Sequence, residues 1–393
     1  MSLDFERQEM HAVMVQRLAE SRALALLGAR QVGKTTLAKS YAAEHHFPYF
    51  DLEDPAALAA LVEPRDVLAD LLAKGATIVI DEVQRHPGLF PVLRSLIDLH
   101  ARDGQFLLLG SASPVLLRES SESLAGRLSM LHMGGVSLRE MHELDMFSLW
   151  LRGGYPRALL AGSPRAAFRW LRDYLSLVIE RDLPQIGLNA PAATMQRFWR
   201  ILANFHGQTW NAAEPARSLG VSEPTVRKYL DFLSGMQLVR QLTPWHENLG
   251  KRQVKAPKIY IRDSGLLHYL WGTDTLDALW LHPRCGASWE GFALEQVLHV
   301  AQPDEAYYWG THGGAELDLL MFKRGLRVGV EFKRSDSPGM TASMHIALQD
   351  LRLDALYVVY PGERRYTIAQ STRSALVQAM PLRHLADIPA DWN

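Results

Sequence analysis

Residues 28–35 limit what this chain can fold into more than any other segment. They read GARQVGKT, in which four residues separate two glycines and Lys-Thr follows the second. The apolar run ALALL precedes them, and a segment of helical composition, TTLAKSYAAEH, begins at their last residue. A glycine-rich turn between a buried strand and a helix places backbone N–H groups and the positive end of the helix dipole around a phosphate group. The pattern predicts a phosphate-binding loop, and its alternative is a glycine turn before an ordinary helix.

The predicted ligand of this loop is ATP with Mg²⁺. Lys34 is expected to reach the β- and γ-phosphates, and the Thr35 hydroxyl is expected to bind Mg²⁺. We expect the nucleotide to contact every residue of the loop and the one after it, namely Gly28, Ala29, Arg30, Gln31, Val32, Gly33, Lys34, Thr35 and Thr36.

Two further apolar runs end in polar residues. The run at residues 77–80 is followed by Asp81 and Glu82. Because ligands bind at the carboxyl ends of strands in parallel sheets, Asp81 is expected to hold the Mg²⁺ shell and Glu82 to polarise the attacking water. The alternative for this acidic pair is a solvated turn. The run FLLLG leads to Ser111, which is predicted either to sense the γ-phosphate or to cap the next helix.

The spacing of short apolar runs indicates an α/β fold for the first third of the chain. Such runs alternate with helical patterns and lie at residues 23–27, 49–52, 77–80, 106–109 and 129–133. This alternation predicts a parallel sheet covered on both faces, as in P-loop NTPases. We assign residues 1–140 to an ATPase domain, 141–280 to a helical lid with a winged helix-turn-helix, and 281–393 to a second α/β domain.

The composition is typical of a folded protein from a reducing compartment. The chain has 393 residues, 42 Lys and Arg against 43 Asp and Glu, and a single cysteine, Cys285, which excludes an intrachain disulfide. Its apolar runs are far shorter than the ~20 residues needed to cross a bilayer. We expect a cytoplasmic protein without membrane contact. Because the global charge is balanced, a nucleic-acid site would depend on local clusters of basic residues.

Residues 210–261 have the pattern of a winged helix-turn-helix. Helices are expected at residues 212–219 and 223–233, with Ser222 as N-cap of the second, the recognition helix. Val226, Leu230 and Leu233 are expected to face inward, and Tyr229 outward. Two strands and a basic loop that includes Lys258 follow. The residues predicted to contact DNA phosphates are Arg227, Lys228, Lys251, Arg252 and Lys255, and the alternative is a protein-docking surface.

Polar residues on two expected strands form a second candidate site. Glu316 and Asp318 lie on one strand and Glu331 and Lys333 on the next, joined by a Lys-Arg-Gly turn at residues 323–325. Because side chains alternate along a strand, the two residues of each pair share a face. Carboxylates on neighbouring strands are suited to binding a divalent metal, and the alternative is the wet face of an ordinary sheet.

This arrangement resembles the core of PD-(D/E)xK nucleases, to which the helix at residues 289–300 would add Glu290 or Glu295. The resemblance implies metal-assisted cleavage of phosphodiesters by Asp318, Glu331 and Lys333. Its predicted ligands for Mg²⁺ or Mn²⁺ are Glu290, Asp318 and Glu331. A fold of this kind can also persist without activity.

Five segments, taken in order along the chain, resemble one protein family. They are DEVQRHPGLFPVLRSLID, GSASPVLL, SLAGR, GGYPRALL and ERDLP. The family comprises bacterial and archaeal AAA-domain ATPases whose C-terminal half is a domain of unknown function. The resemblance implies assembly into a ring, such as a hexamer, with ATP between subunits and an arginine donated by the neighbour. Arg127 of SLAGR is the first candidate for that arginine, and Arg181 of ERDLP is the second.

Two functional interpretations follow. In the first, the chain is an ATP-hydrolysing motor or switch that acts on DNA as a multimer and carries a metal-dependent nuclease domain. In the second, it is an ATP-gated regulatory protein whose C-terminal half docks a protein partner and cuts nothing. ATP turnover that responds to DNA distinguishes the first from the second.

Overall fold

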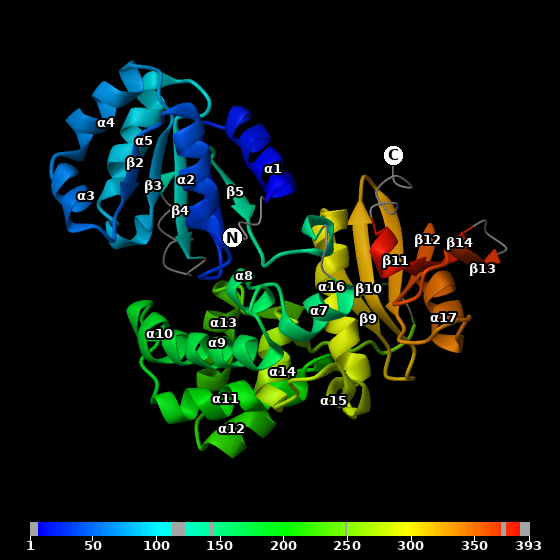
Figure 1. The fold of residues 1–393 in the computed structure, drawn as a ribbon. Coiled ribbons are helices and arrows are strands. Elements are labelled where there is room, and N and C mark those ends of the chain that lie inside the picture. Colours follow the sequence, from blue (N-terminus) through cyan, green and yellow to red (C-terminus); the bar gives the residue numbers. More distant parts are fainter. Residues whose placement is uncertain (1–6, 112–122, 142–144, 248–249, 371–374, 386–393) are drawn as a thin grey trace.

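The computed structural model describes residues 7–111, 123–141, 145–247, 250–370 and 375–385 (Figure 1). Within these ranges there are three sheets, of five, three and six strands. The five-stranded sheet and its helices form one body, and a helical region lies between this body and the six-stranded sheet (Figure 1). In the described ranges, no helix combines the length and apolar character that a bilayer crossing requires.

The five-stranded sheet is parallel throughout, in the order β2-β3-β4-β1-β5. Its strands are β1 (Ala23–Gly28), β2 (Tyr49–Asp51), β3 (Ile78–Asp81), β4 (Phe106–Ser111) and β5 (Leu128–His132). β1, β3 and β4 are buried along their whole length, which explains their uninterrupted apolar sequences. The parallel α/β fold predicted for this domain is confirmed, and the carboxyl ends of the central strands meet at one edge.

Alternate residues of β1 enter two different cores. Leu24 and Leu26 pack on the face covered by α1 (Gln8–Ala19) and α2 (Lys34–His45). Ala25 and Leu27 pack on the opposite face. The helices whose buried leucines share this second core are α4 (Pro64–Ala73) and α5 (Leu89–His100), and α3 (Pro55–Ala60) follows β2 nearby.

Part of the helical region continues the first of these cores. Its elements are α7 (Met146–Arg152), α8 (Pro156–Leu159), α9 (Pro164–Leu177), a π-helical turn (Val178–Asp182), α10 (Leu183–Gln185) and α11 (Ala192–Phe205). Leu171 of α9 and Trp199 of α11 are fully buried in the same apolar cluster as Leu24 and Leu26 of β1. This shared core brings the π-helical turn close to the phosphate-binding loop.

The winged helix-turn-helix contains α12 (Ala213–Leu219), α13 (Glu223–Gly235) and the sheet β6 (Gln208–Thr209), β8 (Lys258–Ile261), β7 (Val239–Leu242), in that order. The Ser222 hydroxyl accepts the N–H of Thr225 at 3.3 Å, so Ser222 caps α13 as expected. Two other expectations need correction. Tyr229 is buried, because it lies one helical turn after Val226 on the inward face. Lys258 is not in the loop but is the buried first residue of β8.

The six-stranded sheet has the order β13-β14-β12-β11-β10-β9. Its strands are β9 (Glu305–Gly310), β10 (Glu316–Lys323), β11 (Leu326–Phe332), β12 (Ala355–Tyr360), β13 (Tyr366–Gln370) and β14 (Leu376–Pro381). β11, β12 and β14 are parallel, whereas β9, β10 and β11 are antiparallel. Arg324 and Gly325, with φ of 50° and 83°, form the tight turn predicted between β10 and β11.

Helices cover both faces of this sheet, and α14 (Ser264–Trp271) and α15 (Leu276–Leu281) lead into it. α16 (Cys285–Ala301) packs on one face and α17 (Ala342–Asp350) on the other. The β9–β10 register shifts between Leu317 and Leu320. These two leucines enter the α17 core, while Leu319 enters the α16 core. Asp318 lies within this irregularity, between Leu317 and Leu319.

Candidate functional site

The phosphate-binding loop joins β1 to α2. Gly33 is the residue before α2 and has a φ of 103°, a conformation that favours glycine. A Cβ atom on Gly28 would overlap the carbonyl oxygen of Met133, so this position also requires glycine. No side chain among the described residues caps α2, which leaves its first N–H groups directed at the space where a phosphate would lie.

Lys34 is folded back over this loop. Its Nζ donates to the carbonyl oxygens of Gly28 and Ala29, each at 2.9 Å. Burial lowers the pKa of Lys34 to about 8, against the opposing effect of Glu82 and Asp81. The ammonium group therefore remains charged at neutral pH and is held by weak carbonyl partners that a phosphate group can replace.

Thr35 and Asp81 meet at the carboxyl end of the sheet. The Thr35 hydroxyl donates to Asp81 Oδ2 at 2.7 Å, and the Tyr49 hydroxyl donates to the same oxygen at 2.5 Å. A hydroxyl and a carboxylate fit Mg²⁺, which proteins typically hold with one or two carboxylates together with substrate phosphates. Sequence reasoning missed Tyr49. Tyr49 reaches Asp81 because β2 pairs with β3. This contact depends on the order of the strands in the sheet, which the sequence does not reveal.

Glu82 follows Asp81 in a left-handed conformation, with a φ of 53° that is rare for a residue other than glycine. Burial raises the pKa of its carboxyl group. Gln84 Nε2 donates to Glu82 Oε2 and, at 3.4 Å, to the hydroxyl of Ser111. Gln84, which sequence reasoning missed, thus links the two residues predicted to act on and to sense the γ-phosphate. The alternative role of Ser111 as a helix cap concerns residues 112–122, which lie outside the described ranges.

The π-helical turn contacts the loop directly. Arg30 Nη1 lies 3.2 Å from Oδ1 of Asp182, whose side chain is 3% exposed. Burial raises the pKa of Asp182, and Arg30 opposes this rise. Arg181 binds Glu53, which also binds Arg85, so Arg181 lies near the carboxyl ends of the strands, on the same side as the loop. A change at the loop can therefore reach the helical region through Arg30 and Asp182.

Arg127 lies at the opposite edge of the sheet. Its carbonyl oxygen accepts the N–H of Ala23, the first residue of β1. The phosphate-binding loop begins at the other end of this strand, at Gly28. The length of β1 separates the two ends by about 17 Å. The Arg127 side chain makes a bidentate pair with Asp98, at 2.6 and 2.9 Å. Arg127 is thus remote from the loop of the same chain.

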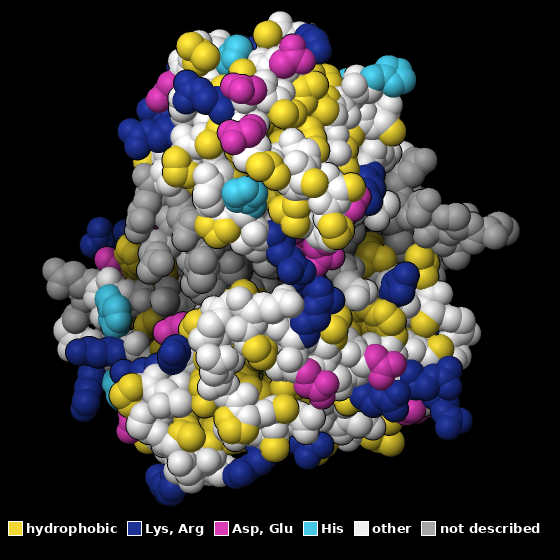
Figure 2. Space-filling view, turned by 90° about the vertical axis from the view of Figure 1, so that its left-hand side faces the viewer, with side chains coloured by type: hydrophobic (Ala, Val, Ile, Leu, Met, Phe, Trp, Pro, Cys, Tyr) yellow, Lys and Arg dark blue, Asp and Glu magenta, His cyan; other side chains and the backbone are white. Residues whose placement is uncertain are grey.

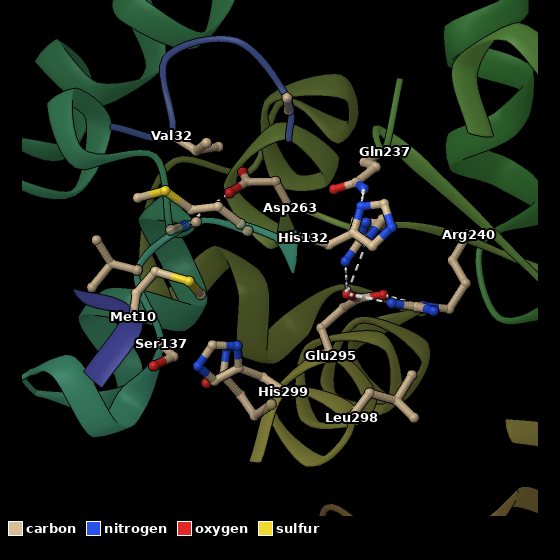
Figure 3. A pocket seen from close by; sticks show the side chains of 18 of the residues that line it. Met10, Val32, His132, Ser137, Gln237, Arg240, Asp263, Glu295, Leu298 and His299 are labelled. Atoms are coloured by element: carbon tan, nitrogen blue, oxygen red, sulfur yellow. Dashed lines mark hydrogen bonds and ion pairs between the residues drawn. The ribbon is translucent and has the colours of Figure 1, made fainter. Parts of the chain in front are cut away.

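A cavity of about 460 Å³ adjoins the loop where the three parts of the chain meet (Figure 3). Figure 3 shows Val32 of the loop at its upper rim, Met10 of α1 on one side, and Glu295 with Arg240 on the other. Burial raises the pKa of Glu295, but Arg240 and Arg262 bind its carboxylate and lower the pKa to about 2. The carboxylate of Glu295 therefore forms ion pairs with these two arginines.

The residues predicted to contact DNA do not all lie together. Arg227 of α13 and Lys255 line one groove of about 670 Å³. Lys228 and Arg252 are also exposed, whereas Lys251 is paired with Asp350 of α17 at 2.7 Å. Figure 2 shows Lys and Arg side chains spread over the lower half of the visible face, which the helical and winged-helix elements form, and at its junction with the upper half.

The residues of the second predicted site converge, but around a lysine. Glu290 of α16 accepts the Tyr260 hydroxyl at 2.6 Å, and its Oε1 lies 3.2 Å from Lys258 Nζ. Lys258 Nζ also lies 3.3 Å from Asp318 Oδ1. Burial, with Asp318 nearby, raises the pKa of Glu331 to about 8, and Lys333 Nζ pairs with Glu331 at 2.8 Å. Of the two glutamates proposed from the helix, Glu290 is the one that reaches Asp318.

The structure differs here from the predicted metal site. No three His, Cys, Asp or Glu side chains within the described ranges are grouped so that they could hold a metal ion. Glu290, Asp318 and Glu331 therefore do not fit a divalent metal in this conformation, because Lys258 takes a place among them. Sequence reasoning placed Lys258 in the basic loop. Its position at the start of the apolar run KIYI was the sign in the sequence that Lys258 belongs to a buried strand.

Comparisons with known proteins identify the first part of the chain. Residues 20–142 match the family described as "AAA domain", which agrees with the parallel sheet and loop described above. Residues 143–277 and 285–385 match two domains of unknown function, DUF8612 and DUF4143.

The chain is 45% identical over 366 residues to an uncharacterized protein of Mycobacterium tuberculosis and equally to one of Mycobacterium bovis, covering 93% of this chain and 82% of each relative. Among solved structures, a Walker-type ATPase of Pyrococcus abyssi shares 16% identity with a TM-score of 0.49, covering 68% of this chain and 96% of that one. The RuvB Holliday junction branch migration motor of Thermotoga maritima shares 19% identity with a TM-score of 0.27, covering 60% and 89%. The sequence identity shows that the chain belongs to the family of these two mycobacterial proteins, and its N-terminal part is an AAA domain.

Proposed function

We propose that the chain is an ATP-hydrolysing switch that acts on DNA as a multimer. The observation that carries this proposal is the meeting of Lys34, Thr35, Asp81 and Glu82 at one edge of the parallel sheet. Lys34 would bind the β- and γ-phosphates, and Thr35 and Asp81 would hold Mg²⁺. When bound, Mg²⁺ supplies charge neutralisation for the phosphates. The cavity next to Val32 is where we place the adenosine part of ATP.

Glu82 would orient and polarise the water that attacks the γ-phosphate. In the structure its carboxylate is held by Gln84, which also reaches Ser111. We therefore infer that a γ-phosphate contact at Ser111 changes the hydrogen bond that Gln84 donates to the Glu82 carboxylate. The Arg30–Asp182 ion pair would transmit the binding of the γ-phosphate to the helical region.

Arg127 would complete the site of a neighbouring subunit. Its distance from its own loop, on the opposite edge of the sheet, supports action between subunits rather than within one. We expect Arg127→Ala to lower ATP turnover by about a thousandfold or more with little effect on ATP affinity, because the arginine stabilises charge only during phosphoryl transfer. Steady-state turnover and titration with a fluorescent ATP analogue measure the two effects.

Two further proteins control this prediction. Asp98→Asn breaks the ion pair with Arg127 but keeps the guanidinium group, so its turnover should stay near wild type. A mixture of Arg127→Ala and Glu82→Gln subunits should recover part of the activity, because the second variant still donates Arg127 to a site with an intact Glu82. Mixed multimers without any recovery would assign the role to Arg181 or to a contact within one subunit.

DNA would bind across the groove that Arg227 and Lys255 line. We expect the double variant Arg227→Ala/Lys255→Ala to weaken duplex binding about tenfold and to reduce the slope of log affinity against log salt by about 2, because two phosphate contacts are lost. Fluorescence anisotropy at several salt concentrations measures both. The control is Arg165→Ala/Arg169→Ala, which removes two exposed arginines from α9. Equal binding by the two double variants would leave this groove without a role in DNA binding.

The nuclease activity predicted from Asp318, Glu331 and Lys333 stays a prediction, and the proposed switch does not depend on it. The ion pairs of Lys258 favour a C-terminal domain that is closed to metal in this conformation. The competing function, an ATP-gated regulator that docks a protein partner, shares the nucleotide site and differs in its response to DNA. We also propose a cytoplasmic location, in keeping with the single, buried Cys285.

A further inference from the structure

Four carboxylates and two lysines meet where the winged-helix unit contacts the six-stranded sheet. We call Glu290, Glu316, Asp318 and Glu331 the carboxylate cluster. They come from α16, β10 and β11, whereas Lys258 comes from β8 of the winged-helix sheet. Lys258 Nζ contacts three members of this cluster: Glu290 at 3.2 Å, Asp318 at 3.3 Å, and Glu316.

The position of Lys258 is fixed by its surroundings. β8 is the central strand of its sheet, and Lys258 is paired with Thr209 on one side and Leu242 on the other. Its side chain is only 4% exposed, and Nζ lies 5.6 Å from the ring centre of Tyr308. Backbone pairing on both flanks fixes the Cα atom of this residue, and burial of the side chain holds the ammonium group at the cluster while β8 keeps this position.

Most carboxylate oxygens that a metal would need already have partners. Besides Lys258, Asp318 accepts the N–H of Phe332 at 3.1 Å, and Glu290 accepts the Tyr260 hydroxyl. Glu331 is paired with Lys333. A divalent metal would have to displace these donors and would lie beside a buried ammonium group of the same sign, which opposes its binding.

We propose that Lys258 is the resident cation of the carboxylate cluster and that it keeps divalent metal ions out while β8 is in place. The charge that a metal would otherwise supply comes from a residue of the preceding unit. Access of metal to the cluster then depends on a movement of β8, and therefore on the state of the winged-helix unit. This inference does not depend on the proposed ATPase activity.

Binding of Mn²⁺ to the full-length, nucleotide-free protein tests the proposal. We expect wild type and Asp318→Asn to bind Mn²⁺ equally by electron paramagnetic resonance titration, because the cluster takes up no metal in either protein. Lys258→Gln should gain one site with an affinity about tenfold or more above any wild-type site, because removal of one partner leaves buried carboxylates uncompensated. The double variant Lys258→Gln/Asp318→Asn should lose this gain. Lys323→Gln, at the other end of β10, is the matched control and should gain nothing.

Two results would overturn the proposal. The first is Mn²⁺ binding by the wild-type protein that Asp318→Asn removes. The second is a Lys258→Gln protein that melts as cooperatively as wild type and yet gains no Mn²⁺ site. The comparison of wild type with Asp318→Asn needs no change at Lys258, so it decides the matter even where Lys258→Gln fails to fold.

Discussion

Replacing Lys34 with alanine is expected to weaken ATP binding by about a thousandfold or more. The ammonium group is buried over the loop, and its hydrogen bonds within the described ranges are to carbonyl oxygens, at 2.9 Å to Gly28 and Ala29. Exchange of these neutral carbonyl partners for phosphate oxygens pairs the ammonium group with an anion, and hydrogen bonds of this ionic kind are roughly twice as strong as those between neutral groups. The variant loses these bonds as well as the charge, and a fluorescent ATP analogue titrated against the protein measures the loss.

Lys74→Ala is the matched control for this variant. Lys74 follows α4, is exposed, and pairs only with Asp70 at 2.6 Å among the contacts described, so its removal should leave ATP affinity unchanged. An affinity of Lys34→Ala within about twofold of that of Lys74→Ala would contradict the assignment of the loop.

Glu82→Gln is expected to keep ATP affinity and to lose turnover by about 10²- to 10⁴-fold, the usual contribution of a positioned general base. An amide has the shape of the carboxylate but cannot accept a proton at neutral pH. Burial raises the pKa of the Glu82 carboxyl group, which makes it a better base than an exposed glutamate. Phosphate release measures turnover, and the fluorescent nucleotide reports binding in the same preparation.

The control for this second variant is Glu63→Gln, which changes an exposed glutamate that precedes α4. It should hydrolyse ATP at the wild-type rate. If Glu82→Gln did the same, the attacking water would have to be polarised by another group, and Asp81 and Asp51, which end the neighbouring strands β3 and β2, would be the next carboxylates to test.

Features set by neighbouring residues could be predicted from the sequence. The strands of the AAA domain follow from their apolar runs, the turn at Arg324 and Gly325 from its composition, and the cap at Ser222 from its place before a helix. For the turn and the cap, the interaction that decides the structure lies within a few residues, and for the strands the apolar run itself is local. The meeting of Thr35 and Asp81, 46 residues apart, was also predictable because carboxyl ends of parallel strands share an edge.

Contacts between distant units could not be predicted in this way. Asp182 reaches Arg30 only because the helical region shares a core with the sheet. Lys258 and Asp318 are 60 residues apart and belong to different sheets, so neither strand periodicity nor charge clustering relates them. A lysine at the start of an apolar strand was a local sign of burial, but its partners depend on how two units pack together.

The Arg30–Asp182 and Lys258–cluster contacts lie on the two sides of the helical and winged-helix units. The first joins these units to the nucleotide site, and the second joins them to the six-stranded sheet. A movement of the winged helix on DNA would therefore strain one or both contacts. Under the proposed function, this arrangement is the route by which we expect bound DNA to alter ATP turnover.

The rate of ATP hydrolysis across a titration with duplex DNA tests the central claim most directly. We predict that the steady-state rate of the wild-type protein rises with DNA and levels off at the concentration where binding saturates, and that Arg227→Ala/Lys255→Ala needs more DNA for the same rise. A rate that stays constant while anisotropy shows the DNA to be bound would contradict a DNA-acting switch and would favour the ATP-gated regulator.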